Sequence, residues 1–111
     1  MLFDAHTHIQ FPAYDGDREE TLARARAVGV KMIAVGTQYA TSFMAVNLAE
    51  KYPDDVWASI GFHPNHAVST GWYHDPKEQK SAEPEIFDRK KFEELARSAK
   101  VVAIGECGLD Y

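Results

Sequence analysis

Residues 31–61, KMIAVGTQYATSFMAVNLAEKYPDDVWASIG, contain a complete strand–helix–strand unit. The two strands, KMIAV at 31–35 and VWASI at 56–60, are apolar at most positions, which is typical of strands buried on both faces. Between them, apolar side chains at helical spacing predict a helix that starts at about Ser42 and ends before Pro53. Because a strand, a helix and a second strand in this order form a right-handed crossover, the two strands are expected to lie parallel in one sheet.

The same alternation precedes this unit. Residues 2–5 form a short apolar strand. A helix is then predicted from Asp17, with Glu20 three residues later completing a capping-box pattern, and Gly29 ends it. These two elements add a second strand–helix–strand crossover to the first.

The alternation also continues after the unit. Residues 64–87 contain Pro, His, Gly, Trp and many charges without a clear period, which predicts a long loop of functional or mobile character. Asp88 then caps a helix whose apolar stripe includes Phe92 and Leu95, and VVAIG at 101–105 is the fourth strand. The sequence therefore predicts one α/β domain with a parallel sheet of four strands.

The composition is that of an ordinary globular domain, with 45% hydrophobic and 26% charged residues among 111. The net charge of −5 argues against an extended basic surface for nucleic acid, although bound metal ions can supply the positive charge that a phosphodiester needs. No apolar run reaches the ~20 residues of a membrane helix, and Met1 is not followed by a secretion signal, so neither is expected. The single cysteine, Cys107, favours a reducing, cytoplasmic location.

Two histidines come at the end of the first predicted strand, in the sequence DAHTH at 4–8. Residues i and i+2 of an extended chain point to the same side, so His6 and His8 can present two imidazoles to one point. A transition-metal site requires such an arrangement. The pair alone is equally compatible with two histidines that lie close together at the surface.

Glu106 directly follows the fourth strand and is preceded by Gly105, which lets the backbone turn sharply. His63 follows the third strand in the same way. Taken alone, Glu106 is better explained as a solvent-exposed loop residue. In a parallel α/β barrel, however, all strands end at one face, where such enzymes assemble their active sites, so these groups are expected to converge with the two histidines.

Two imidazoles and one carboxylate make an incomplete ligand shell for Zn²⁺, Mn²⁺ or a similar cation. The two oxygens of Glu106 could bridge two metals about 3.5–4 Å apart, the spacing of two-metal hydrolase sites. Histidine ligands argue against a site that holds Mg²⁺ alone. The sequence thus indicates a metal-dependent hydrolase.

The other histidines and two aromatic residues each allow a functional and a structural interpretation. His63 either contacts a substrate phosphate or is fixed by its own loop. His66 and His74 are interpreted as loop residues rather than ligands. Trp72 and Tyr73 could stack on a base or sugar, but such residues more often anchor a long loop, which is the interpretation preferred here.

Three motifs, DAHTHI at 4–9, IGFHPNH at 60–66 and VVAIGECGLDY at 101–111, resemble the TatD family of metal-dependent hydrolases in order and spacing. The resemblance implies a (β/α)₈ TIM barrel with a two-metal site and, in many members, deoxyribonuclease activity of the 3′-5′ exonuclease type. It implies that His6 and His8 bind the first metal, that Glu106 bridges both metals as a catalytic residue, and that His63 lies near the scissile phosphate. The stretch from 67 to 88 is longer than the connection usual in the family.

A barrel of this kind takes about 250 residues and eight strands, so residues 1–111 are expected to be the N-terminal half of one domain. The missing half would come from the same protein or from another copy of the chain, and we prefer the first. The expected function is hydrolysis of phosphodiester bonds, with DNA as the expected substrate. Two divalent ions (Zn²⁺, Mn²⁺ or Mg²⁺) are expected to activate water. The alternatives are a related barrel acting on a phosphomonoester or ester, and a non-catalytic half-barrel that assembles by sheet pairing.

Overall fold

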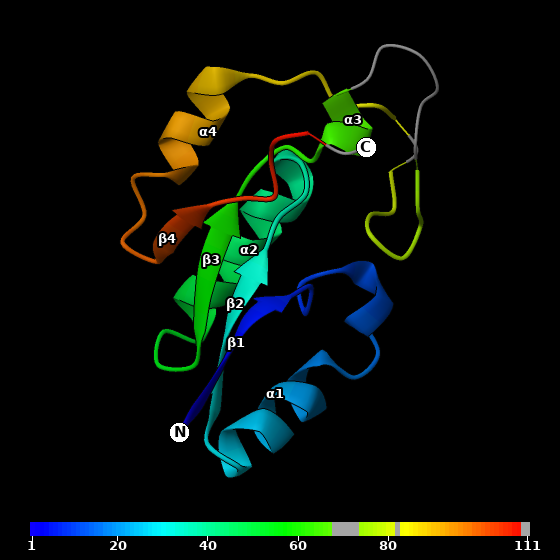
Figure 1. Cartoon of the computed structure of the whole chain (residues 1–111). Coiled ribbons are helices and arrows are strands. Elements are labelled where there is room, and N and C mark those ends of the chain that lie inside the picture. Colours follow the sequence, from blue (N-terminus) through cyan, green and yellow to red (C-terminus); the bar gives the residue numbers. More distant parts are fainter. Residues whose placement is uncertain (68–73, 82, 110–111) are drawn as a thin grey trace.

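Four parallel strands form one sheet in the order β1-β2-β3-β4. The computed structural model describes residues 1–67, 74–81 and 83–109, in which the strands are β1 (Leu2–Thr7), β2 (Val30–Val35), β3 (Val56–Ile60) and β4 (Val101–Ile104). The predicted parallel α/β sheet is therefore confirmed (Figure 1). β1 extends two residues beyond the expected end, which places His6 within the strand.

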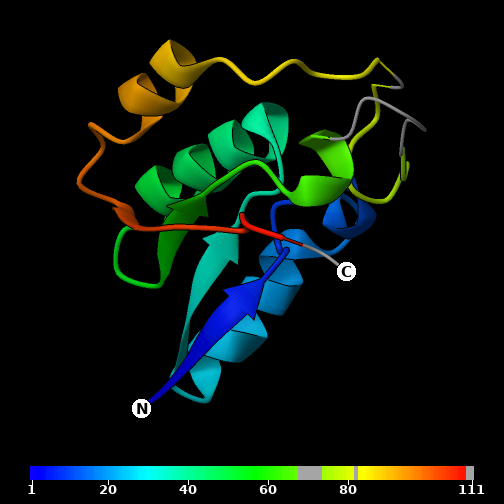
Figure 2. The same cartoon turned by 45° about the horizontal axis from the view of Figure 1, so that its top comes forward.

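Helices connect the strands as the crossover pattern requires. The helical elements are η1 (Pro12–Tyr14), α1 (Arg18–Ala27), α2 (Tyr39–Lys51), α3 (Pro64–Ala67) and α4 (Arg89–Leu95). Figure 2 shows α1 and α2 lying on the same side of the sheet, while α3 sits near the end of β3. None of the helices in the described ranges combines the length and the apolar character needed to cross a membrane.

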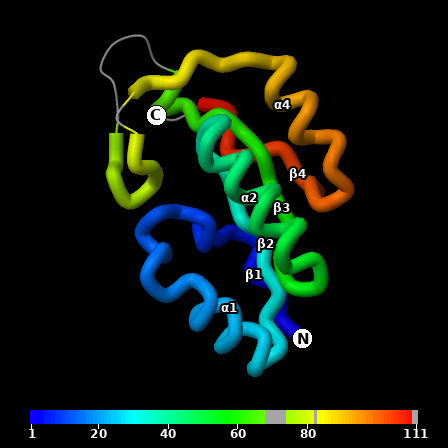
Figure 3. Tube along the Cα trace, turned by 180° about the vertical axis from the view of Figure 1, so that it is seen from behind, coloured from blue at the N-terminus to red at the C-terminus, as the bar shows by residue number. Residues whose placement is uncertain are grey.

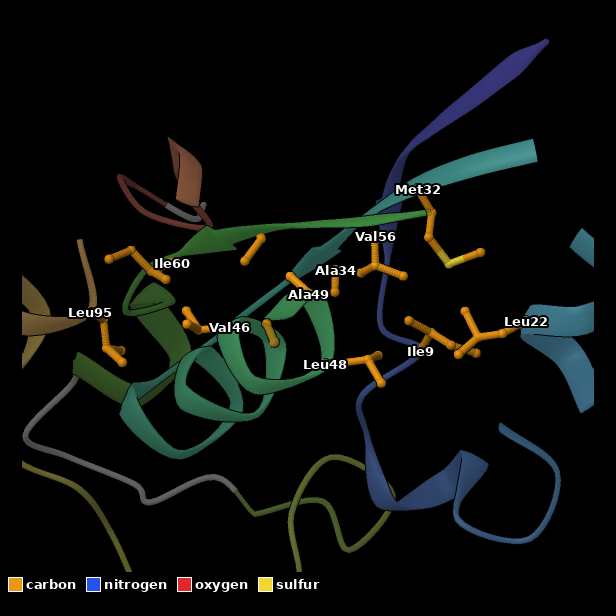
Figure 4. Packing of buried hydrophobic residues seen from close by; sticks show 12 residues of the cluster. Ile9, Leu22, Met32, Ala34, Val46, Leu48, Ala49, Val56, Ile60 and Leu95 are labelled. Carbon is orange, nitrogen blue, oxygen red and sulfur yellow. The ribbon is translucent and has the colours of Figure 1, made fainter. Parts of the chain in front are cut away.

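The core lies between α2 and the helix-facing side of the sheet. Ala45 and Ala49 of α2 and Ala58 of β3 are fully buried members of one cluster, and such small side chains let a helix approach strands closely. Figure 4 shows Ala49 beside Ala34 of β2 within this cluster. Leu22 of α1 extends the same cluster at one end and Leu95 of α4 at the other. Each larger aliphatic side chain buried in this cluster contributes about 1.5–3 kcal/mol, and α2 supplies two of them, Val46 and Leu48.

Two helix starts differ from the expectation. α2 begins at Tyr39, three residues before Ser42, because Gln38 and Thr41 form a reciprocal capping box there. Asp17 does precede α1, but its side chain makes no capping hydrogen bond, so the predicted capping box with Glu20 is wrong. The predicted cap of α4 is confirmed, since the Asp88 carboxylate accepts a hydrogen bond from the Lys90 amide at 3.0 Å.

Both outer strands of the sheet are exposed. Leu2 and Phe3 of β1 are 70% and 50% exposed, and Val102 and Ile104 of β4 are 52% and 69% exposed. Exposed apolar side chains of this kind are expected on the two edge strands when only four of the eight strands of a barrel are present. The sheet is thus consistent with the first half of a (β/α)₈ barrel.

Candidate metal centre

His6 and His8 come together at the C-terminal end of β1. The two imidazole rings lie 5.1 Å apart between centroids and are nearly perpendicular, at 86°. The side chain of His6 is 56% exposed and that of His8 is 32% exposed, so both remain accessible to an ion from solvent. The prediction that the His-x-His pair faces one point agrees with this geometry.

The backbone of Glu106 is held against two neighbouring strands. The Gly105 amide donates to the Ile60 carbonyl at 2.8 Å, and the Glu106 amide donates to the Gly36 carbonyl at 3.2 Å. Gly61 makes this approach possible, because a Cβ at that position would lie 2.5 Å from the Gly105 carbonyl carbon. A glycine after β3 therefore allows the residue after β4 to reach the histidines.

The carboxylate of Glu106 meets both imidazoles. Its Oε1 lies 3.3 Å from His6 Nε2 and its Oε2 lies 3.9 Å from His8 Nε2. One ligand atom from each residue falls within a group no wider than 4.8 Å. Nitrogen and oxygen ligands lie about 2.0–2.2 Å from Zn²⁺, so the space between the three side chains fits one divalent cation after small side-chain adjustments.

The orientation of His8 is fixed by its other ring nitrogen. Nδ1 of His8 lies 2.8 Å from the Val35 carbonyl oxygen. Because a carbonyl oxygen only accepts hydrogen bonds, Nδ1 donates and the lone pair of the neutral ring is on Nε2, the atom that faces Glu106. The ring also stacks on Phe11, with centroids 4.4 Å apart. His8 is thus prepared to act as a ligand.

His63 lies beside the three-residue cluster rather than within it. Its amide donates to the Thr37 carbonyl at 2.7 Å, and its ring Nδ1 accepts from the Asn65 amide at 3.0 Å. In the neutral ring Nε2 therefore carries the proton and can donate. His63 and Glu106 both line a polar cavity of about 190 Å³ and a second cavity of about 420 Å³.

Sequence reasoning missed one buried acidic group at this site. Glu78 is only 6% exposed, and its carboxylate accepts hydrogen bonds from Thr37 Oγ1 and from His66 Nε2, the latter at 2.8 Å. Burial raises the pKa of Glu78, but the hydrogen bonds from His66 and Thr37 and the nearby His66 and His8 outweigh it and lower the pKa overall. Nothing in the charged, aperiodic loop sequence distinguishes Glu78 from its neighbours.

The other histidines and aromatics of this region play different parts. His66, expected to be a loop residue, lies in α3 and pairs with Glu78. His74 contacts the Gln79 carbonyl at 3.1 Å, in keeping with its interpretation as a loop residue. Trp72 and Tyr73 lie outside the described residues.

A larger cavity elsewhere contains none of the three clustered residues. Its volume is about 540 Å³, and its lining is mostly apolar, including Phe62, Phe92 and Ile104. Glu93 and Cys107 line this cavity, but no histidine does, so volume alone does not locate the candidate site. The polar cavity beside Glu106 is lined by imidazoles and carboxylates, which is the chemistry that a metal site requires.

Comparison with known proteins places the chain in a family. The family model described as TatD related DNase matches residues 3–111, so the chain belongs to this family. Within it, the chain is 39% identical over 112 residues to the uncharacterized metal-dependent hydrolase YabD of Bacillus subtilis (strain 168), covering 100% of this chain and 38% of that protein.

Relatives that are named as nucleases match this chain at nearly the same sequence identity as YabD does. The chain is 37% identical to the 3′-5′ ssDNA/RNA exonuclease TatD of Edwardsiella piscicida, over 99% of this chain and 37% of that protein. It is 39% identical to the protein of the same name from Pantoea sp. (strain At-9b), with the same two coverages. The chain thus spans little more than a third of the length of these curated relatives.

Proposed function

We propose that this chain supplies the first metal site of a divalent-metal-dependent phosphodiesterase, a TatD-like deoxyribonuclease of the 3′-5′ exonuclease type. The observation that carries the proposal is the convergence of His6, His8 and Glu106, contributed by β1 and β4, at one end of a parallel sheet. Family membership and the names of the relatives support the same reaction class.

Each side chain has a separate role in this proposal. His6 and His8 would hold the first cation, and the Val35 carbonyl keeps His8 in the tautomer whose Nε2 could bind it. Glu106 would hold the same cation and would also be a ligand of a second one. When bound, two divalent ions would lower the pKa of a water molecule and neutralise charge that develops on a phosphoryl oxygen.

His63 is proposed to bind the substrate phosphate and to assist catalysis. Its Nδ1 is occupied by the Asn65 amide, so its Nε2–H is available to donate to a non-bridging phosphoryl oxygen. The shared cavity with Glu106 brings such an oxygen close to the metal ligands. A hydrogen bond that strengthens as charge develops on the phosphoryl group stabilises the transition state.

The remaining ligands of the second cation would come from the missing half of the barrel. We propose that this half belongs to the same protein, and another copy of the chain is the alternative. Imidazole ligands favour Zn²⁺ or Mn²⁺, and Mg²⁺ is the third candidate ion. The cytoplasmic location remains a prediction.

A nuclease assay on the complete barrel tests this proposal. A 5′-labelled single-stranded DNA should be shortened from its 3′ end in the presence of Mn²⁺ or Mg²⁺ and left intact with a chelator. His6→Ala and Glu106→Gln should each reduce the rate strongly. Glu94→Gln, which changes an exposed glutamate of α4, is the matched control and should keep full activity.

Three outcomes separate the alternatives. Unchanged activity in both site variants would show that the assigned roles are wrong. Hydrolysis of a phosphomonoester or a simple ester, with DNA left intact, would favour the related barrel. Absence of any bound transition metal at a ratio near one per chain would favour a non-catalytic segment.

A further inference from the structure

A short turn from the long connection packs beside the candidate site. The amides of Glu78 and Gln79 donate to the Asp75 carbonyl at 3.0 and 3.1 Å, which closes the turn. The Ala13 amide donates to the Lys77 carbonyl at 3.1 Å, so the turn is fastened to η1, the helical turn that follows β1 (Figure 3). The turn therefore has a defined place at this end of the sheet.

The Glu78 side chain points from this turn into the protein. Its carboxylate is shared by two donors that belong to different elements, Thr37 after β2 and His66 in α3. The His66 and Glu78 side chains are only 6% and 8% exposed, so the pair is shielded from solvent. Hydrogen bonds to a buried carboxylate are strong and directional, and they fix the groups that donate them.

Both partners of Glu78 also hold the backbone of His63. The Thr37 carbonyl accepts from the His63 amide at 2.7 Å, and the His66 amide donates to the His63 carbonyl at 2.9 Å. The two polar backbone groups of His63 are therefore bound by the same two residues whose side chains meet at Glu78. Glu78 is therefore a contact common to the two residues that bind the backbone of His63.

We propose that Glu78 is a positioning residue that holds His63 with its Nε2 directed to the cavity shared with Glu106. Glu78 does this through Thr37 on one side of His63 and through His66 on the other. This inference rests on the proposed role of His63 as the group that binds the substrate phosphate. It gives the turn at 75–79 a part in the reaction, although this turn supplies no residue to the metal cluster.

A double-mutant cycle on the complete, metal-loaded barrel tests the proposal. We expect Glu78→Ala to lower kcat/KM about tenfold or more, because displacing a catalytic contact by ~1 Å can cost up to ~100-fold. In a His63→Ala background the same change should have almost no further effect, since the group it positions is gone. Zn²⁺ affinity should stay the same in all four proteins.

Two further variants distinguish positioning from general destabilisation. Glu78→Gln retains an acceptor for Thr37 and a polar partner for His66, so we expect it to keep activity within about threefold of the unchanged protein. Glu83→Gln alters an exposed glutamate of the same connection and is the matched control, with no expected effect. Equal losses from Glu78→Ala in both His63 backgrounds, unchanged activity, or a loss of metal binding would each overturn the proposal.

A measurement without turnover keeps this inference separate from the proposed function. In histidine-labelled protein, the His63 ring signals, assigned by their loss in His63→Ala, should shift or broaden in Glu78→Ala and stay in place in Glu78→Gln. If the unchanged protein hydrolyses no phosphodiester, the proposed function fails while these signals still report on the position of His63. Undisturbed His63 signals in Glu78→Ala would overturn the positioning role itself.

Discussion

At the scale of single residues, the candidate metal site depends on backbone groups that are not themselves candidate ligands. The Val35 carbonyl selects the ring nitrogen that His8 presents to Glu106, and the missing side chain of Gly61 lets Gly105 and Glu106 approach β3. Such supporting contacts commonly change metal affinity or activity by about 10–100-fold when they are removed.

Gly61→Ala is expected to weaken metal binding about tenfold or more. The added methyl group would lie 2.5 Å from the Gly105 carbonyl carbon and 2.6 Å from the Glu106 carbonyl oxygen, so the backbone that carries the carboxylate must shift. Competition with a chromogenic Zn²⁺ chelator measures the affinity. Gly16→Ala is the control, because a Cβ there has no heavy atom within 4 Å. Equal affinities for the two variants would contradict the argument.

The ionised Glu78 carboxylate is expected to stabilise the fold in a pH-dependent way. The pKa of Glu78 is lowered in the folded chain, so its stabilisation is complete above the ordinary glutamate range and is lost as the pH falls through the lowered value. Urea unfolding of the unchanged protein and of Glu78→Gln, from pH 7 down to pH 3, checks this. The difference in unfolding free energy should narrow towards acid, and a difference that widens would refute it.

At the scale of elements, the sequence located strands better than helix starts. The predicted strand 56–60 coincides with β3, because its buried apolar run is bounded by Asp55 and Gly61. α2 begins earlier than its apolar pattern indicated, because the capping box of Gln38 and Thr41 depends on side-chain conformation. Apolar periodicity reports the buried face of a helix, whereas its first turn is set by local hydrogen bonds.

Asp88→Ala is expected to destabilise the folded chain by about 1 kcal/mol, the usual value for loss of an N-cap side chain. The Asp88 carboxylate accepts a hydrogen bond from the Lys90 amide in the first turn of α4. Asp17→Ala provides the matched control, because Asp17 precedes α1 without a side-chain capping bond. Thermal or urea unfolding compares the two variants. A larger loss from Asp17→Ala than from Asp88→Ala would disprove this assignment.

At the scale of the whole molecule, the sheet has two open edges and an uncovered apolar surface. Val102 and Ile104 of β4 and Leu2 and Phe3 of β1 are all at least half exposed. The apolar cavity of about 540 Å³ beside α4 also opens near the end of β4, with Ile104 and Cys107 in its lining. In the proposed barrel, further strands and helices would cover these surfaces.

The 111-residue chain taken by itself is therefore expected to self-associate. Sedimentation should show species heavier than its 12.5 kDa, because exposed strand edges and apolar faces bind one another. Combining Val102→Lys with Ile104→Lys should reduce the association. Val28→Lys, at an apolar residue beyond α1 that is 74% exposed, should not. A monomer at all concentrations would show that the exposed edges do not drive pairing.

The sequence by itself determined the parallel α/β order and the approximate positions of the strands, and it predicted the candidate ligands His6, His8 and Glu106. These follow from local periodicity and from the rule that parallel strands end at one face. Only the tertiary structure decided how Glu78 reaches Thr37 and His66, and why Gly61 must lack a side chain. The physical reason is that these contacts join residues far apart in the chain, and no local pattern records which distant groups will share a hydrogen bond or a close approach.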